Sequence, residues 1–361
     1  MPSDTVGAGA VSPGQIAAAA TALMPELFEE IALAADSLAD DLAERLGMVA
    51  WEREEQIGAA QRRLIELRAR RFHRFGGDPA LVRELREQPL EALELAWRAL
   101  RRGRRVHVES EVGACPGVFR LLRNMSDRLE PGVLTVSAPG ILDHAHADWQ
   151  AIGVRRRSER VALVQADADR ELAAYVLARG CLRRTGFDPR VVHRVIVVGR
   201  SERLERTLRR LWIGARMGPV DDEHAFAGPV DEPRAERFLA VEAAWRAREQ
   251  VTTLCPGGRL ERADALGQCF LAPALFRVPS PAQGGELPTG DPEPCGPMLI
   301  VYPARTSAEG EALLDHFAPR NQGRLRFGEK PRDLSLRSID GQIHGALLVE
   351  RLPPGLPEPR P

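Results

Sequence analysis

The chain is poor in cysteine, and its cysteines follow no pairing pattern. Only five occur in 361 residues, and none forms a CxxC pair. Proteins that depend on disulfides have more cysteines at closer spacing, so a disulfide framework is not indicated. We expect free thiols and a cytoplasmic location, where the compartment is reducing. The five residues are Cys115, Cys181, Cys255, Cys269 and Cys295.

The chain also lacks an excess of charge of either sign. Its 50 basic residues balance 51 acidic ones, which leaves a formal net charge of −1. No overall field therefore attracts the chain to nucleic acid or to an anionic membrane. One arginine-rich run, RARRFHRF at residues 68–75, follows acidic residues, and we interpret it as a solvated helix face. We expect no nucleic-acid partner.

Long apolar segments and glycine-rich phosphate loops are missing as well. The run AAAATALM near the N-terminus is too short to span a bilayer, and no basic segment of the signal-peptide type precedes it. We therefore expect no association with a membrane. No GxGxxG or GxxxxGK sequence occurs, so the common loops that cradle phosphates are absent.

Short β-branched runs that alternate with helical segments follow Gly103. The runs are mostly continuously apolar, as in strands that are buried on both faces of a sheet, and the helices between them suit parallel crossovers. The pattern predicts an α/β fold. The runs are VHV (106–108), VLTV (133–136), VALV (161–164), VIVV (195–198), MLIVY (298–302) and ALLV (346–349).

Helices are expected before and between these strands. An apolar stripe with the spacing of one helix face runs from Leu27 to Leu46, and Gly47 offers a stop. A second helical stretch covers residues 52–75. Further along, Ser201 and Asp231 stand where the N-caps of two later helices are expected.

Five blocks between about residues 160 and 305 resemble the catalytic half of the aldehyde dehydrogenase superfamily in order and spacing. They are similar to its Asp-Ala-Asp helix start, its Arg-Val-Ile-Val strand, its Gly-Pro-Leu-Ile helix, its Gly-Gly turn with the following strand, and its Glu-x-Phe-Gly-Pro segment. The blocks are VALVQADADREL, HRVIVVGRSERLERTLRRL, GPVDEPRAERFLAVEAAWRA, TLCPGGRLERADALGQCFLAPALFRVP and EPCGPMLIVYP. Upstream, ALRRGRRVHVESEVGACP and LEPGVLTVSAPG resemble strands of the family's cofactor domain.

The resemblance implies an α/β fold with the two-lobed, three-layer architecture of that family, with parallel, Rossmann-like sheets and a helical N-terminal arm. We expect a mobile leader at residues 1–24, and then the helical arm plus a reduced cofactor-type lobe at residues 25–150. A catalytic-type lobe follows at residues 151–350, and a loose proline-rich tail at residues 351–361.

The resemblance also implies where the family's chemical groups would lie. Its chemistry needs a thiolate nucleophile and a carboxylate base. Counting without gaps from Asp167 puts Pro189 at the nucleophile position and Arg155 at the base position. Neither side chain can take over that role at neutral pH. The family's cofactor-binding lysine is matched by Glu109, which reverses the charge, and its nicotinamide-ribose glutamate is matched by Glu293.

These departures imply a catalytically degenerate, truncated member of the superfamily that acts as a scaffold or regulatory subunit. It would form a homo-oligomer, or a hetero-oligomer with an active aldehyde dehydrogenase, and would bind no cofactor, since the family's Gly-Ser-Thr-x-x-Gly loop has no counterpart. The alternative is an NAD(P)-dependent aldehyde or acyl oxidoreductase that uses a relocated thiol, Cys181 or Cys295. A sensor that binds a small molecule in the vestigial cleft is a third hypothesis.

Two other groups of residues are interpreted as structural. The motif DHAHADW offers Asp143, His144, His146 and Asp148, but it follows a Pro-Gly turn and has no second ligand pair nearby. We therefore expect a surface loop and no metal site. His193, beside a predicted strand, is expected to be structural, and Cys181 is expected to be a small buried residue of a helix.

Overall fold

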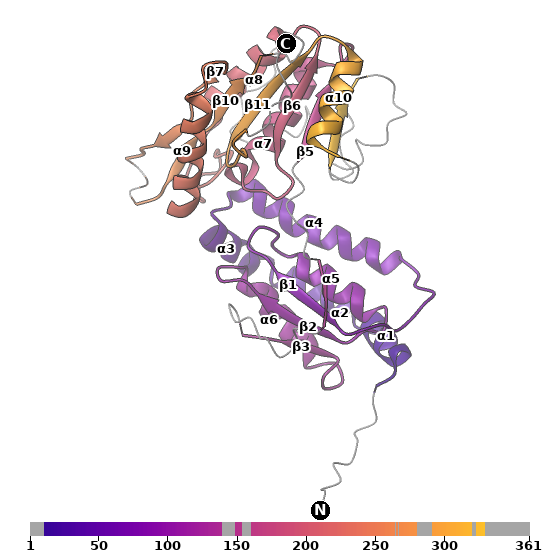
Figure 1. The fold of residues 1–361 in the computed structure, drawn as a ribbon. Helices are drawn as coiled ribbons and strands as arrows, with labels where there is room; N and C mark the ends of the chain where they lie inside the picture. Colours follow the sequence, from indigo (N-terminus) through magenta and orange to yellow (C-terminus); the bar gives the residue numbers. More distant parts are fainter. Residues whose placement is uncertain are drawn as a thin grey trace, which may run out of the picture. The chain divides into compact units, whose positions relative to one another are not determined.

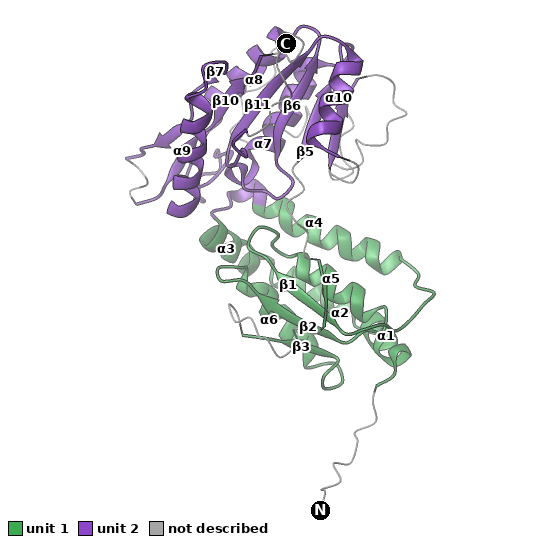
Figure 2. Cartoon of the chain, in the orientation of Figure 1, with its two compact units in different colours: residues 1–46, 53–155 green, residues 47–52, 156–361 purple. Residues whose placement is uncertain are grey.

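The computed structural model describes residues 11–138, 149–153, 160–263, 265, 267–279, 291–319 and 323–328. The chain divides into two compact units, which are coloured separately in Figure 2. Unit 1 comprises residues 1–46 and 53–155, and unit 2 comprises residues 47–52 and 156–361. The lobe boundary that we expected at 150/151 lies slightly before the observed division at 155/156.

Unit 1 begins with helices, and the first of them lies inside the expected leader. Helix α1 (Pro13–Ala22) starts at Ser12, whose side chain and that of Gln15 form a capping box. Ile16, Ala17 and Ala20 of this helix are buried. Burial of its apolar side explains why this part of the leader is folded.

The apolar stripe from Leu27 to Leu46 belongs to two helices rather than one. Helix α2 (Met24–Leu33) ends at Ala34, and α3 (Ala35–Leu46) follows directly. The stripe itself is buried as predicted, at Leu27, Ile31, Leu38 and Leu42. The spacing of the apolar residues therefore continues across the break between the two helices.

The expected helix at residues 52–75 is shorter than predicted. Helix α4 (Ala50–Ala69) ends before the arginine-rich run is complete, so the prediction of a helix is wrong for residues 70–75. Arg101 explains the end, because its guanidinium donates to the carbonyl oxygens of Leu67 and Arg70. Phe72 lies beneath Arg101, with the guanidinium carbon 5.4 Å from the ring centroid.

Among the described residues of unit 1, four parallel strands form a sheet in the order β3-β2-β1-β4. The strands are β1 (Ala80–Glu84), β2 (Val106–Ser110), β3 (Leu134–Val136) and β4 (Gln150–Ile152). Helix α5 (Glu91–Leu100) connects β1 to β2, and α6 (Pro116–Ser126) connects β2 to β3. Helix α1 contacts α5, and both α2 and α3 contact α6 (Figure 1).

In the described part of unit 2, six strands form a sheet in the order β12-β5-β6-β11-β10-β7. They are β5 (Arg160–Val164), β6 (Val192–Val198), β7 (Thr252–Cys255), β10 (Ala274–Arg277), β11 (Met298–Ala304) and β12 (Arg324–Phe327). Only β7 is antiparallel to its neighbour among these described strands. A separate antiparallel pair is formed by β8 (Gly258–Leu260) and β9 (Phe270–Ala272).

Helices cover both faces of the unit 2 sheet. Alternate residues of a strand point to opposite faces, and β6 places Val195 and Val197 in one core and Ile196 in the other. The first core includes α7 (Arg170–Leu182) and α8 (Glu202–Gly214), and the second includes α9 (Glu232–Arg246) and α10 (Ser307–Phe317) (Figure 1). The predicted α/β, three-layer architecture is confirmed for this unit.

Most of the strands and helix starts that were predicted from the sequence are present in the structure. Five of the six predicted strands are present, as β2, β3, β5, β6 and β11. Ser201 and Asp231 directly precede α8 and α9 as predicted. The run ALLV and the proline-rich tail lie outside the described residues. Among the described residues, no helix has both the length and the apolar character needed to cross a bilayer.

Glu84 is a buried carboxylate at the end of β1. Its two oxygens accept hydrogen bonds from the backbone nitrogens of Leu90, at 2.7 Å, and Ala92, at 3.1 Å. Leu90 has a left-handed φ of 64°, and its own side chain makes no capping bond at the start of α5. Burial raises the pKa of Glu84 from 4.5 to about 8, although the two backbone donors act in the opposite direction.

Glu84 therefore makes the stability of the fold depend on pH. A carboxyl group with a raised pKa contributes stability that is complete below pH 4.5 and is lost as the pH rises through about 8. Glu84→Gln cannot ionise, so its free energy of unfolding should decline less over this interval than that of the wild type. Urea unfolding at a series of pH values measures the difference.

The exposed Glu130 provides the matched control. Glu130→Gln should follow the pH dependence of the wild type. Parallel stability curves for the wild type and Glu84→Gln would contradict the assignment.

Candidate functional site

The turn between α7 and β6 is the place where the sequence resemblance puts the nucleophile. Helix α7 ends at Leu182, and a short 3-10 helix, η2 (Arg183–Gly186), leads into residues 187–191 and β6. Residues 183–189 are all buried. We call this segment the nucleophile-position turn.

The backbone of the nucleophile-position turn is left-handed at three successive residues. The φ angles are 51° at Arg184, 51° at Thr185 and 74° at Gly186. Such angles are unfavourable for residues other than glycine, above all for a β-branched threonine. The hydroxyl of Thr185 donates to the carbonyl oxygen of Gly228 at 2.7 Å, which holds the turn in place.

Glu52 supports the same turn from a distant part of the sequence. Its Oε1 accepts a hydrogen bond from the backbone nitrogen of Arg184 at 2.5 Å, and its Oε2 accepts one from Val49 at 3.2 Å. Burial raises the pKa of Glu52 to about 7, against the opposing effect of these bonds and of the Arg183 charge. Burial also lowers the pKa of Arg184 to about 10.

Asp188 interacts with arginines on both sides of it in the turn. Its carboxylate lies 3.7 Å from Nε of Arg183 and 3.8 Å from Nε of Arg190, and it accepts a hydrogen bond from the backbone nitrogen of Arg190 at 2.8 Å. Burial alone would raise the pKa of Asp188, but the surrounding guanidinium groups outweigh it and lower the pKa. Pro189 follows this ionised carboxylate and is itself buried.

The loop that carries Glu293 packs against the turn. Gly186 lies so close to the backbone of Gly296 that an added Cβ would stand 2.0 Å from the carbonyl atoms of Gly296. The ring of His193 adds a second link, because its Nε2 lies 3.0 Å from the carbonyl oxygen of Gly296. The structure thus brings together the two segments that the sequence resemblance assigned to the nucleophile and to the nicotinamide ribose.

Glu293 itself is exposed on this loop. Its neighbours are anchored, because Nε1 of Trp245 donates to the carbonyl oxygen of Pro292 at 3.2 Å and Arg248 pairs with Asp291. No hydrogen bond or ion pair joins the carboxylate of Glu293 to another residue of the described part of the chain. Because its neighbours are anchored, the carboxylate of Glu293 is exposed to solvent at a fixed position.

Both candidate replacement thiols are buried. Cys181 lies on α7 and donates to the carbonyl oxygen of Met298 at 3.2 Å, and burial raises its pKa well above the ordinary value. Cys295 donates to the carbonyl oxygen of Arg237 at 3.7 Å. A thiol that is kept protonated by burial is a poor nucleophile.

The remaining cysteines share this burial. All five are free thiols. Burial raises the pKa of Cys115 to about 12 and also raises the pKa values of Cys255 and Cys269.

Several predicted site residues lie elsewhere. Glu109 is on β2 of unit 1, where it is buried and its Oε2 lies 3.1 Å from Nε of Arg83. Arg155 lies outside the described residues, as do the aspartates and histidines of the DHAHADW motif. Within the described ranges, no three side chains of His, Cys, Asp or Glu gather closely enough to hold a metal ion.

The sequence did not reveal the part that Glu52 plays. It stood in a run of charged helix residues that reads as a solvated face, whereas its side chain is 1% exposed. The acidic and basic residues next to Glu52 in the sequence do not indicate that its side chain is buried. Only the fold puts Glu52 beside a turn more than a hundred positions away in the chain.

The contact between Gly186 and Gly296 predicts that the turn tolerates no side chain at position 186. Gly186→Ala should lower the free energy of unfolding by about 3–5 kcal/mol, since it adds overpacking to left-handed strain. Gly267 is the matched control, because its φ is 83° and nothing lies within 4 Å of an added Cβ. Gly267→Ala should lower it by only about 1–2 kcal/mol. Urea unfolding followed by circular dichroism measures both values, and equal losses would contradict the proposed contact.

The comparisons with known proteins address the fold. No family model and no curated protein match the sequence. Solved structures do match: a putative aldehyde dehydrogenase from Burkholderia cenocepacia has a TM-score of 0.72 at 17% identity over 90% of this chain and 76% of its own. An NAD-dependent benzaldehyde dehydrogenase from Corynebacterium glutamicum has a TM-score of 0.67 at 16% identity over 87% and 82%. The chain therefore has the fold of the aldehyde dehydrogenases, as the sequence resemblance implied.

Proposed function

We propose that the protein is a catalytically degenerate aldehyde-dehydrogenase-like protein that acts as a scaffold or regulatory subunit. The observation that carries the proposal is Pro189. The turn, its glycine and its contact with the Glu293 loop are present, yet the position that the resemblance assigns to the nucleophile is occupied by a side chain without a nucleophilic atom. Covalent attack on an aldehyde from this position is then impossible.

The surroundings of Pro189 support the proposal. Asp188 is engaged by Arg183 and Arg190, so the carboxylate beside Pro189 is paired with guanidinium groups of the same segment. They are not arranged around a thiolate. Side chains that pair with one another in this way are compatible with a structural role for the turn.

The residues at the expected cofactor positions do not fit NAD(P). The lysine position holds Glu109, a buried carboxylate that is committed to Arg83. A carboxylate repels the anionic parts of a nicotinamide cofactor, where a lysine attracts them. Glu293 alone matches the family, and the solved relative named as NAD-dependent is similar to this chain only at 16% identity. We therefore propose no redox step.

The second candidate is an NAD(P)-dependent oxidoreductase that uses Cys295 or Cys181. Its support is the position of Cys295, which directly precedes Gly296 and so lies next to the turn. Against it stand the complete burial of both thiols and the raised pKa of Cys181. A scaffold role would depend instead on self-association or on binding to an active relative.

A turnover assay distinguishes the two candidates. The purified full chain is incubated with NAD⁺ or NADP⁺ and a panel of aliphatic and aromatic aldehydes, and formation of NAD(P)H is followed by absorbance. We expect no turnover above that of a chain-free control, because no activated nucleophile is present. An active aldehyde dehydrogenase in the same assay verifies the reagents.

Two variants identify the source of any activity. Cys181→Ser and Cys295→Ser each remove one candidate thiol and change little else in volume. Turnover by the wild type that is lost in either variant would contradict the scaffold proposal and establish the oxidoreductase.

A further inference from the structure

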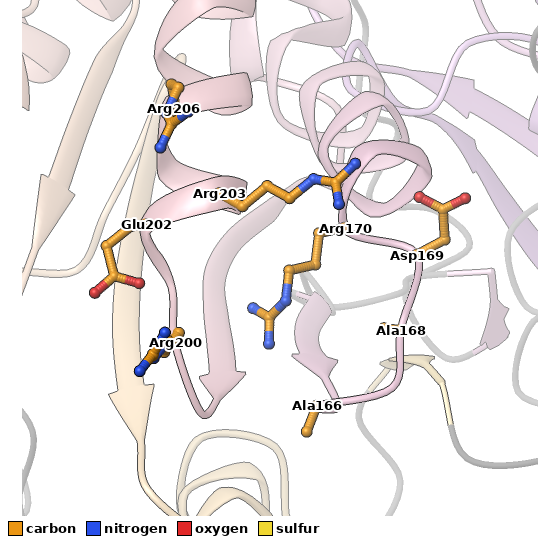
Figure 3. Close-up of a pocket in the computed structure, with 8 residues that line it drawn as sticks. All are labelled: Ala166, Ala168, Asp169, Arg170, Arg200, Glu202, Arg203 and Arg206. Atoms are coloured by element: carbon orange, nitrogen blue, oxygen red, sulfur yellow. The ribbon is translucent and has the colours of Figure 1, made fainter.

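A second concave site lies at the other end of β6 from the nucleophile-position turn. It is a pocket of about 630 Å³ in unit 2, where β5 leads into α7 and β6 leads into α8. Figure 3 shows Arg203 of α8 and Arg170 of α7 extending into the space between the starts of these helices. We call it the arginine pocket.

Cationic side chains dominate the lining of the arginine pocket. Four arginines face two carboxylates, Asp169 and Glu202. The arginines are Arg170, Arg200, Arg203 and Arg206. This excess of positive charge is local, because the chain as a whole carries a formal charge of −1. A concentrated positive charge in a concave site attracts anions.

The cations of the arginine pocket are not neutralised by the protein. Arg200, Arg203 and Arg206 are exposed, and in the described part of the chain none of them forms an ion pair. Asp169 is occupied as the N-cap of α7, where it accepts hydrogen bonds from Glu171 and Leu172 at 3.0 Å each. One oxygen of this carboxylate is thereby engaged by the backbone of the helix.

Arg170 is held in position with one nitrogen unsatisfied. Its Nη2 donates to the carbonyl oxygen of Val198 at 2.9 Å, which fixes the guanidinium at the end of β6. Its Nη1 is buried and has no hydrogen-bond partner among the described residues. A buried donor of this kind normally has a hydrogen-bond partner, and Arg170 brings this incompletely paired guanidinium to the edge of the pocket.

The start of α8 adds backbone donors that no side chain caps. The N-cap residue Ser201 turns its hydroxyl to Glu205, with the Oγ–Oε1 distance at 2.5 Å, and makes no capping bond. The other carboxylate oxygen of Glu205 lies 3.3 Å from Arg277. The first amide groups of α8 are therefore free of a side-chain cap, which suits phosphate oxygens.

From this combination we propose that the arginine pocket binds a ligand through a di- or triphosphate group. Guanidinium groups pair with phosphate oxygens in bidentate fashion, and several of them around one cavity favour a multiply charged anion over a single carboxylate. The volume is within the usual range for sites of small organic ligands and exceeds what a lone phosphate fills. The ligand is an inorganic polyphosphate or a nucleotide.

This proposal does not rest on the absence of catalysis. The arginine pocket is built from the carboxyl ends of β5 and β6, whereas the nucleophile-position turn precedes β6. An anion bound there can stabilise unit 2 or signal the presence of a nucleotide, whether or not the other end of β6 performs chemistry.

Calorimetric titration of the full chain tests the proposal at constant ionic strength, which keeps charge screening equal. The probes are pyrophosphate, tripolyphosphate, ADP and sulfate. We expect saturable binding of the di- and triphosphates at least about tenfold tighter than that of sulfate. Tighter binding of ADP than of pyrophosphate identifies a nucleotide as the ligand, and equal binding identifies an inorganic polyphosphate.

Variants locate the site. Arg203→Gln combined with Arg206→Gln removes two exposed cations and should weaken pyrophosphate binding about tenfold or more. Arg237→Gln, which removes an exposed cation on α9, is the matched control and should leave it unchanged. Absence of saturable pyrophosphate binding, equal affinity for sulfate, or equal weakening by the control would overturn the proposal. Circular dichroism verifies that the variants are folded.

Discussion

The close approach of Gly186 to Gly296 is the constraint on which the arrangement of unit 2 depends. It leaves no room for a Cβ at position 186, and it joins the end of α7 to the loop before β11. Arg184 and Thr185 adopt left-handed angles to reach this contact, and Glu52, Gly228 and Asp188 supply the hydrogen bonds and charges that hold them there. These contacts hold the strained backbone of the turn in one shape.

Under the proposed function, the turn keeps its shape without the chemistry that the resemblance implies for it. The resemblance places a nucleophile in this turn, and the position reached by counting holds a buried proline beside an ion-paired aspartate. Both candidate replacement thiols are buried, and burial raises the pKa of Cys181. The proposed function leaves packing and binding as the roles of the fold, and the proposed anion site at the far end of β6 is one surface for binding.

The sequence predicted the parts that depend on local pattern. Continuous apolar runs such as VIVV identified buried parallel strands, and Asp231 marked a helix start, because burial and capping act over a few residues. Boundaries that depend on distant partners could not be predicted. Helix α4 ends where Arg101 takes its last carbonyl groups, and α1 is folded because its apolar side is covered.

The same distinction applies to the sites. The position of Pro189 followed from counting along one block, while the support from Glu52 required the fold. The four arginines of the pocket did not stand out in the sequence, since their convergence depends on two strands that end side by side. Such a cluster can be predicted only when it is known that the carboxyl ends of two neighbouring strands lie at the same edge of the sheet.

The central claim is that no cysteine of this chain is an activated nucleophile, and alkylation of the native protein by iodoacetamide tests it most directly. Peptide mapping by mass spectrometry should find all five thiols reacting far more slowly than free cysteine in the folded protein and at ordinary rates after unfolding in urea. Reaction of Cys181 or Cys295 in the folded protein faster than that of free cysteine would contradict the account.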